Sequence, residues 1–302
     1  PWLTFSSVNN YSYYNSQTHG YYDPKSSSGE GVNGRTTEYN YVSTRRYTNQ
    51  LLRFKKSWGK HNVNALLAYE FNDYEMKYTD VYATGFISGF EDFMTAAKPE
   101  MANGYRTAWA KQSYFTQWRY DYDSRYYGEL SLRRDGRSNF GSNNRYGNFF
   151  SVSGAWNINN ESWFKADWVD QLKLRASVGW VGNDQGIGRF LYVQYYNTGG
   201  QPGWNLGPEF NLGMGGTISE GDLANPDLRW ERGIKYNGGI DFTMFNSRLR
   251  VSMDGFYEKR WDIITNTGGS YVVGIPDVFG KVSSYVNAGE VINRGADIEF
   301  AW

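Results

Sequence analysis

Charged side chains that could do chemistry are concentrated between residues 119 and 135. Four carboxylates lie close together there: Asp121, Asp123, Glu129 and Asp135. Their number raises the question of a calcium site, but their spacing does not follow an EF-hand loop, which needs ligands at fixed positions around a glycine. Pairing with Arg119, Arg133 and Arg134 explains the carboxylates better. We therefore expect ion pairs here, with no bound metal and no cofactor.

Catalytic groupings are not evident elsewhere in the sequence. The two histidines, His19 and His61, fall in a predicted loop and beside a predicted turn. Neither is singled out by a nearby nucleophile or a second metal ligand, as a Ser-His-Asp hydrolase or a histidine metal site would require. The sequence also contains neither a Walker A motif nor a dinucleotide-binding glycine motif. We predict that the protein is not an enzyme.

The charged residues lie on alternating segments that predict β-strands. Side chains of a strand point to opposite faces with period two. In the segment 126–135, Tyr126, Leu130 and Leu132 share one face, and Glu129, Arg133 and Asp135 share the other together with Ser131. The segments 111–122 and 146–159 divide in the same way, apart from Phe115 on the polar side. This pattern is typical of antiparallel sheet with one apolar and one polar face.

Ten such runs follow one another along the chain. They are predicted at residues 2–14, 37–57, 62–79, 111–122, 126–135, 146–159, 169–182, 232–245, 248–264 and 293–302. The links between them alternate between long and short, with long links at 80–110 and 183–231 and tight turns such as Asp123-Ser124-Arg125 and Asn246-Ser247. An up-and-down meander with elaborate loops at one end and tight turns at the other gives this alternation. Outer-membrane β-barrels have short periplasmic turns and long extracellular loops.

Composition narrows the class further. Aromatic residues make up 19% of the chain and the mean hydropathy is −0.68, with 35 Gly and no Cys. The absence of Cys excludes a disulfide framework. Lys plus Arg and Asp plus Glu number 31 each, so no excess of positive charge favours a nucleic acid. No segment approaches the roughly 18 apolar residues of a membrane helix, which does not exclude barrel strands that are only half apolar.

A wide barrel in lipid explains the two faces better than a soluble sandwich does. Such a barrel directs its apolar face outward and lines its lumen with the charged residues. Tyrosines and tryptophans near the strand ends, such as Tyr126 and Trp163, fit the headgroup level, although cross-strand pairs in a soluble sheet would also use them. The residues predicted to face the lumen, where they contact a plug or the solute, are Arg119, Asp121, Glu129, Arg133, Asp135, Arg175 and Asp241.

Aromatic residues with polar neighbours on the long links are candidates for ligand contact. They could stack on sugar rings or hold peptide side chains, and packing of the loops on themselves explains them equally well. The candidates are Tyr82, Phe86, Trp109, Trp204 and Trp230.

Four ordered motifs resemble the SusC/RagA family of TonB-dependent outer-membrane transporters of Bacteroidetes. SLRRDGRSNFGSNNRYGNFFSVSGAWNI begins at Ser131, and LKLRASVGWVGNDQGIG begins at Leu172. NPDLRWE begins at Asn225, and the hairpin from Phe245 with NRGADIE follows. The resemblance is clear from about residue 112 onward. Arg137, Phe150 and Val181 depart from the residues that the family often has at these positions, without changing the match.

The resemblance implies an all-β fold, namely part of a large antiparallel transmembrane barrel of about 22 strands. It implies active import of a bulky nutrient, a glycan or peptide, across the outer membrane of a Gram-negative bacterium. The implied partners are a SusD-like surface lipoprotein, the TonB-ExbB-ExbD complex and outer-membrane lipid. The alternative is a SusC-like barrel with a structural, adhesive or scaffolding role; a soluble carbohydrate-binding β-protein is a third reading.

The chain starts at Pro1 within a strand-like run and contains ten predicted strands. We therefore expect residues 1–302 to be a portion of the barrel. The N-terminal extension, the TonB box, the plug domain and the C-terminal strands of the family are expected to lie outside this chain.

Overall fold

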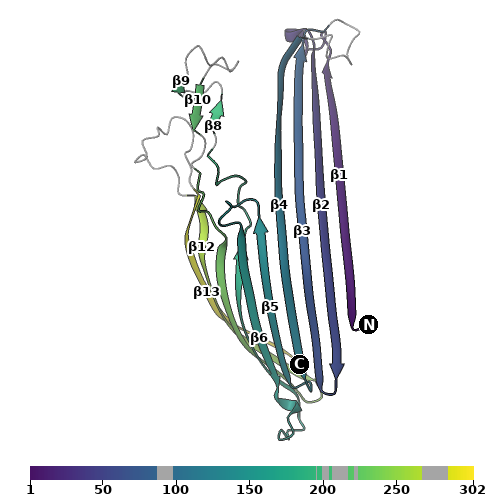
Figure 1. The fold of residues 1–302 in the computed structure, drawn as a ribbon, viewed down its shortest axis with the longest axis vertical. Helices are drawn as coiled ribbons and strands as arrows, with labels where there is room; N and C mark the ends of the chain where they lie inside the picture. Colours follow the sequence, from purple (N-terminus) through teal and green to yellow (C-terminus); the bar gives the residue numbers. More distant parts are fainter. Residues whose placement is uncertain (87–97, 195, 199–203, 206–216, 221–223, 267–284) are drawn as a thin grey trace. The chain divides into compact units, whose positions relative to one another are not determined.

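The computed structural model describes residues 1–86, 98–194, 196–198, 204–205, 217–220, 224–266 and 285–302. Ten antiparallel strands form one sheet in the order β1-β2-β3-β4-β5-β6-β7-β11-β12-β13 (Figure 1). Their bounds are β1 (Leu3–Tyr22), β2 (Arg35–Trp58), β3 (His61–Thr84), β4 (Lys98–Tyr122), β5 (Tyr126–Arg137), β6 (Tyr146–Asn157), β7 (Val169–Asn183), β11 (Glu231–Met244), β12 (Leu249–Asn266) and β13 (Tyr285–Ala301). The ten predicted strands and their meander order are confirmed.

Five short elements complete the described structure. The 3-10 helices η1 (Glu30–Val32) and η3 (Ile158–Asn160) lie in links between strands. Strands β8 (Tyr196–Thr198), β9 (Trp204–Asn205) and β10 (Thr217–Glu220) form a separate small sheet in the order β8-β10-β9. This small sheet lies within the long link predicted at 183–231. In the part of the chain that the structure describes, no helix is long and apolar enough to cross a membrane.

The chain divides into two compact units. The wall unit comprises Pro1–Ser6, Gln50–Tyr69 and Gln112–Trp302, and the hairpin unit comprises Ser7–Asn49 and Glu70–Lys111. The wall unit contains residues 50–58 of β2, 61–69 of β3 and 112–122 of β4, which are 9, 9 and 11 residues. A tilted strand needs about 9–11 residues to cross a bilayer. The hairpin unit contains the remaining residues of these strands and most of β1.

Several strands are longer than predicted, so the links between them are shorter. β1 continues to Tyr22, β4 begins at Lys98 and β13 begins at Tyr285, so the predicted links at 15–36, 80–110 and 265–292 are shorter than expected. The added parts of β1 and β4 expose residues of both faces to solvent. A strand with no apolar face to bury lacks the alternation by which strands are recognised.

Register divides the wall unit into an apolar face and a polar face. One row on the apolar face joins Tyr126, Trp156, Leu174, Ile240, Met253 and Ile298 as direct neighbours across six strands. Large side chains on this face remain exposed, including Leu132 at 45%, Ile298 at 72% and Phe300 at 73%. An exposed apolar surface of this extent marks contact with lipid or another apolar partner. The face assignment made from alternation is confirmed for these strands.

A row of small residues crosses the same apolar face. Its members are direct cross-strand neighbours: Gly128, Gly154, Ala176, Gly238, Gly255 and Ala296. A Cβ atom added at Gly128 would meet nothing within 4 Å, and one at Gly238 would lie 3.9 Å from the nearest atom. Small side chains thus follow one another across six strands on this face.

Tight turns close one end of the wall unit. Asp123 and Ser124 have φ of 55° and 56°, and Asn246 and Ser247 have φ of 55° and 62°. Two consecutive positive φ values are typical of type I′ turns, whose twist matches that of a hairpin. The Asp123 amide donates to the Lys60 carbonyl over 2.8 Å. The predicted turn residues thus form the turns and link neighbouring hairpins.

Three of the sequence motifs meet in one small core at the other end of the strands. Phe140, Ile187, Leu228 and Trp230 are buried together. The rings of Phe140 and Trp230 stack with centroids 5.2 Å apart, and the Trp230 indole donates to the Arg145 carbonyl over 3.1 Å. The Asn139 amide donates to the Ile187 carbonyl over 3.0 Å. The motifs therefore encode the packing of links between strands.

Candidate functional site

The polar face of the wall unit brings the predicted charged residues together as ion pairs. Glu129, Ser153, Ser177 and Asn237 are direct neighbours in one row across β5, β6, β7 and β11. Arg119 on β4 donates to the Glu129 carboxylate over 2.8 Å, and Gln117 also donates to it. Glu129 thus has two donors from β4, and the charge of Arg119 is balanced.

A second pair lies further along β5. Arg133 donates to the Asp135 carboxylate over 2.7 Å and to the Ser113 hydroxyl over 3.2 Å. Its guanidinium carbon lies 5.2 Å from the centre of the Phe115 ring. This contact explains why an aromatic residue interrupts the polar face of β4, because a guanidinium stacks favourably on an aromatic face.

The most connected group is centred on Arg175 of β7. Its guanidinium donates to Asp241 of β11 over 2.8 Å and to Asp254 of β12 over 3.0 Å. The Ser252 hydroxyl donates to Asp241 over 2.9 Å. The arginine thus joins three strands, with two carboxylates for one guanidinium. We predicted Arg175 and Asp241 from the sequence but not Asp254, whose partner lies two strands away.

Asp121, the seventh predicted residue, is held by neutral donors. Its carboxylate accepts from the Asn62 amide over 3.0 Å and from the Ser124 backbone over 3.2 Å. All seven predicted lumen-facing residues therefore lie on the polar face of the wall unit and are all hydrogen-bonded. Among the described residues, no group of three or more His, Asp or Glu is placed to hold a metal ion.

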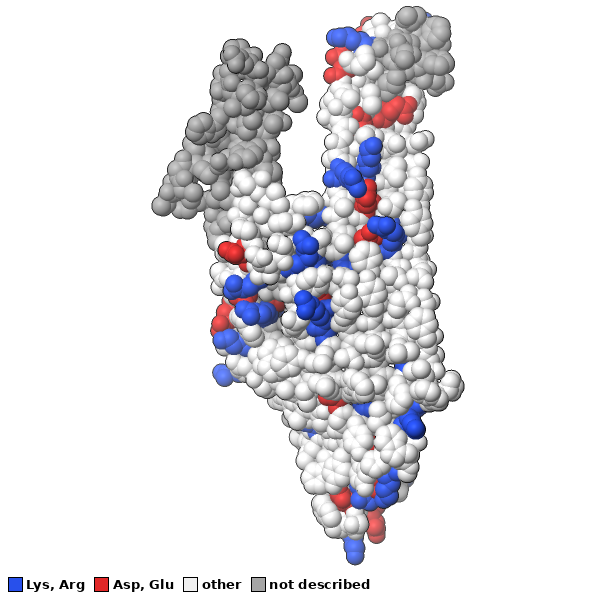
Figure 2. Space-filling model, in the orientation of Figure 1, with Lys and Arg blue, Asp and Glu red and all other residues white. Residues whose placement is uncertain are grey.

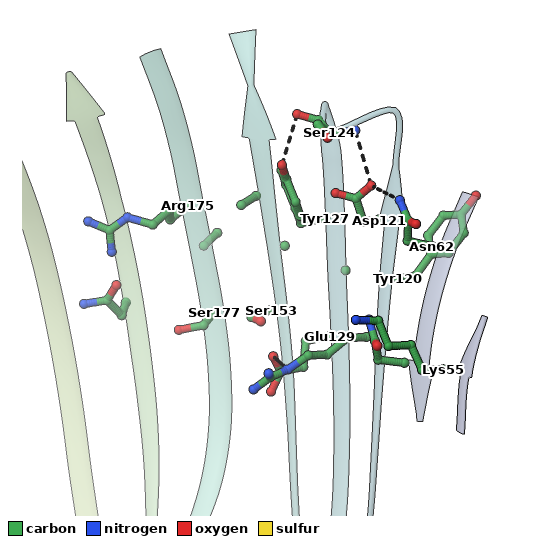
Figure 3. Close-up of a pocket in the computed structure, with 17 residues that line it drawn as sticks. Lys55, Asn62, Tyr120, Asp121, Ser124, Tyr127, Glu129, Ser153, Arg175 and Ser177 are labelled. Atoms are coloured by element: carbon green, nitrogen blue, oxygen red, sulfur yellow. Dashed lines mark hydrogen bonds and ion pairs between the residues drawn. The ribbon is translucent and has the colours of Figure 1, made fainter. Parts of the chain in front are cut away.

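A groove of about 620 Å³ runs along this face. Figure 3 shows Arg175 on one side of it and Asn62 with Asp121 on the other, with Ser153 and Ser177 on the strands between. The small hydroxyl side chains of Ser153 and Ser177 leave the space in the middle, and charged residues, among them Lys55, Arg119 and Glu129, border it. On the surface seen in Figure 2, Lys and Arg adjoin Asp and Glu at several points. Such a groove offers hydrogen bonds without a strong field of one sign.

The predicted ligand-contact aromatics lie elsewhere than expected. Tyr82 and Trp109 are in β3 and β4 and not in a loop, because these strands are longer than predicted. Phe86 is 3% exposed and Trp230 is 5% exposed. Loop packing, the alternative considered from the sequence, accounts for these two residues. The side chain of Trp204 lies outside the described part of the chain.

A group of hydrogen bonds that we did not predict lies near Trp230 and is centred on Asp262. Asp262 lies at an irregularity of β12 with φ of 58°. Its carboxylate accepts from Arg229 over 2.8 Å and also from Arg232. The Asn287 amide of β13 donates to the carbonyls of Arg229 and Asp262, both over 2.8 Å. Because a β-bulge redirects a side chain, no spacing rule along β12 would have identified this carboxylate.

The sheet is antiparallel and open, with an exposed apolar face, an ion-paired opposite face and tight turns at one end. These features together define the wall of an outer-membrane β-barrel. The family model described as "TonB dependent receptor-like, beta-barrel" matches residues 1–302. TonB-dependent receptor P39 of Formosa agariphila is 32% identical over 246 residues, which cover 80% of this chain and 22% of that protein.

Two further similarities specify the type. TonB-dependent receptor SusC of Bacteroides thetaiotaomicron is 25% identical over 289 residues, covering 90% of this chain and 27% of SusC. The structure of the RagAB peptide transporter matches with a TM-score of 0.77 and 25% identity, over 99% of this chain and 32% of that one. This chain belongs to the TonB-dependent receptor-like β-barrel family, is of the SusC/RagA type and is an outer-membrane protein. It spans between about a fifth and a third of the length of these relatives.

Proposed function

We propose that this chain is a portion of the barrel wall of an active importer for a bulky nutrient, an oligosaccharide or a peptide. The observation that carries the proposal is the match of the whole chain to a TonB-dependent receptor barrel, together with the SusC and RagAB similarities. Energy would come from TonB with ExbB and ExbD, and a SusD-like lipoprotein would cap the outer end. The chain performs no catalysis in this scheme.

The two faces of the wall unit support this proposal, because each suits a different environment. The apolar face contacts outer-membrane lipid, and the polar face lines the lumen with Arg119, Glu129, Arg175 and their partners. Arg119 is paired with Glu129, and Arg175 with Asp241 and Asp254, so a solute passing these residues meets hydroxyl and amide groups beside charges that already have partners. Finding the Arg119–Glu129 pair accessible to a lipid-soluble probe would contradict this orientation.

The test uses the full-length protein in its native host. Uptake of labelled oligosaccharides and peptides is measured before and after disruption of TonB, and the protein is purified to look for a bound lipoprotein. An importer loses accumulation without TonB and is recovered with its lipoprotein. Unchanged accumulation without TonB, together with no lipoprotein, would favour the structural or scaffolding role.

A further inference from the structure

The apolar face of the wall unit is hollowed by a groove over strands β3 to β6. The groove has a volume of about 360 Å³. One side chain from each of these neighbouring strands lines it: Leu67, Thr116, Leu132 and Phe150. The Thr116 hydroxyl donates to the Leu66 carbonyl over 2.9 Å, so it needs no partner within the groove. An apolar chain would therefore fill this space without leaving a polar group unpaired.

Arg134 supplies a cation at the border of this groove. It is among the lining residues and lies two residues beyond Leu132 on β5, which places it on the same face of the sheet. Its direct cross-strand neighbour is Asn148 of β6, which also lines the groove. The guanidinium carbon lies 4.8 Å from the centre of the Tyr146 ring. The groove thus combines apolar side chains with one positive charge and one amide.

Arg134 differs from its neighbours in having no carboxylate partner. We expected it to pair with an acidic residue, as Arg119 and Arg133 do. Within the described part of the chain, however, no carboxylate forms an ion pair with it. The reason is its face, because Glu129 and Asp135 lie on the polar side of β5. An arginine on a lipid-facing surface is most costly at the bilayer midplane and costs little at the interface. Arg134 therefore requires the headgroup level and is free to meet an anion there.

The position of Arg134 along β5 matches the headgroup level of the outer leaflet. β5 begins at Tyr126, next to a tight turn, and outer-membrane barrels have such turns on the periplasmic side. The stretch 126–134 is nine residues long, and a tilted strand crosses a bilayer in about 9–11 residues. Polar groups gather at this level, where Gln112 accepts from the Tyr146 hydroxyl over 3.0 Å and donates to the Tyr114 hydroxyl over 2.9 Å.

The groove would stay open in a complete barrel. Strands β3 to β6 each have a neighbour on both sides within the sheet, so further barrel strands would join at the edges, β1 and β13. A plug domain would lie against the polar face. Neither would cover a groove that opens on the apolar face. The exposure of Leu67 at 58% and Leu132 at 45% is therefore an exposure to the membrane.

We propose that this groove binds a single phosphate-bearing lipid of the outer leaflet, with an acyl chain in the groove and the phosphate at Arg134. A guanidinium binds phosphate through two parallel hydrogen bonds, and the Asn148 amide lies beside it as a further donor. A second copy of the protein packed here would cover the apolar side chains but would leave Arg134 without an anion. The inference rests on the orientation in the proposed function, in which the apolar face contacts lipid.

The test compares lipids that differ only in phosphate. The purified full-length protein in micelles is titrated with phosphorylated lipid A, with the same lipid A after removal of its phosphates, and with inorganic phosphate. Native mass spectrometry counts the retained lipids and gives their affinity. The phosphorylated lipid should be retained about tenfold more tightly than the dephosphorylated one. Inorganic phosphate should bind far more weakly than either lipid, because it has no acyl chain.

Four variants assign the binding to this groove. Arg134→Gln should lower the affinity for the phosphorylated lipid to that for the dephosphorylated one, and Arg134→Lys should keep part of the difference. Thr116→Phe fills the groove and should weaken the binding of both lipids. Lys259→Gln is the matched control and should change neither affinity. Lys259 lies on the same face as the direct neighbour of Ile234, but it already pairs with Glu290 over 2.9 Å.

Several outcomes would overturn the inference. They are equal affinity for the two lipids, unchanged affinity in Arg134→Gln, or an equal loss in Lys259→Gln. Binding of inorganic phosphate as tight as that of the lipid would also overturn it. Heat-modifiable gel migration verifies that each variant is folded. TonB-dependent uptake is measured separately in the host, and its presence without lipid retention would leave the proposed importer standing and remove only the lipid site.

Discussion

Arg175 and Asp254 form an ion pair although a whole strand lies between them. Arg175 on β7 and Asp254 on β12 both face Gly239 of the intervening β11 in direct register. The guanidinium passes over this glycine to reach the carboxylate at 3.0 Å. A Cβ atom at position 239 would lie 2.5 Å from the Asp254 carboxylate and 3.0 Å from the Arg175 guanidinium carbon. Gly239 is therefore the residue that permits the contact.

Gly239→Ala should break this contact. The added methyl group separates the two charged groups, so we expect a loss of about 1.5–3 kcal/mol in the free energy of unfolding, the range of a hydrogen bond to a charged group. Gly238→Ala is the matched control, because its Cβ points to the apolar face and meets nothing closer than 3.9 Å. Urea unfolding of the refolded protein in micelles, followed by tryptophan fluorescence, measures both. Equal effects of the two substitutions would show that backbone freedom, and not the ion pair, is responsible.

Arg175→Leu should be more damaging than removal of its partners. It leaves Asp241 and Asp254 without their cation on a half-buried surface, and we expect a cost of about 2–3 kcal/mol. Adding Asp241→Asn and Asp254→Asn should recover part of that loss, because the uncompensated negative charges disappear. The same unfolding assay applied to the single, double and triple variants measures the coupling. If the changes in the free energy of unfolding simply add across the set, Arg175 is not coupled to the two carboxylates.

The division into faces could be predicted from the sequence because it depends on period two alone. Leu130, Leu132 and Glu129, Arg133 lie on the faces that alternation assigned to them, and the tight turns fall where Asp123-Ser124 and Asn246-Ser247 predict them. These features are local, so each residue's neighbours in sequence determine them.

The features that could not be predicted depend on distant strands. Asp254 reaches Arg175 over a glycine two strands away, and the orientation of Asp262 follows from an irregularity in β12. Trp230 was expected on a binding loop, but it is buried against Phe140, 90 residues away in sequence. The length of β4 was missed because its first part exposes both faces. Contacts of this kind can be predicted only when the register of the neighbouring strands is known.

Gly182→Ala should disturb the small core next to the strands. The Phe149 ring lies directly over Gly182 and Gly147, so a methyl group at position 182 collides with it. Phe149 also packs edge-on against Trp230 with centroids 5.6 Å apart, and its displacement should transmit the strain to that ring. We expect a loss of about 1–3 kcal/mol and faster proteolysis within residues 184–230, read by mass spectrometry of the cleavage products.

The rescue variant makes this prediction specific. Combining Gly182→Ala with Phe149→Leu should slow proteolysis relative to Gly182→Ala alone, because the smaller side chain makes room for the methyl group. Gly154→Ala is the control, since its Cβ would lie 3.6 Å from the nearest atom. Proteolysis at the control level in Gly182→Ala would contradict the proposed packing.

Glu161 should make the tight-turn end of the wall unit sensitive to acid. Its carboxylate accepts from the Tyr126 hydroxyl over 2.5 Å and from the Trp156 indole over 2.9 Å. The hydrogen bond from Tyr126 first, and that from Trp156 second, hold the pKa of this carboxyl below its ordinary value. A lowered pKa means that the folded state favours the charged form. The associated stability is complete above about pH 4.3, the ordinary value of a glutamate, and is lost as pH falls through the lowered pKa.

Glu161→Gln removes this titration while keeping an oxygen acceptor for both donors. The variant should be less stable than the wild type at neutral pH, by an amount that stays constant down to about pH 4.3 and shrinks as the pH falls below that value. Urea midpoints measured across this range in micelles give the two pH profiles. Asp123 has its pKa lowered by the hydrogen bond from Lys60, so Asp123→Asn should converge with the wild type in the same direction at low pH. Parallel pH profiles for wild type and Glu161→Gln would show that Glu161 does not carry the acid sensitivity, because its ionisation would then be unlinked to folding.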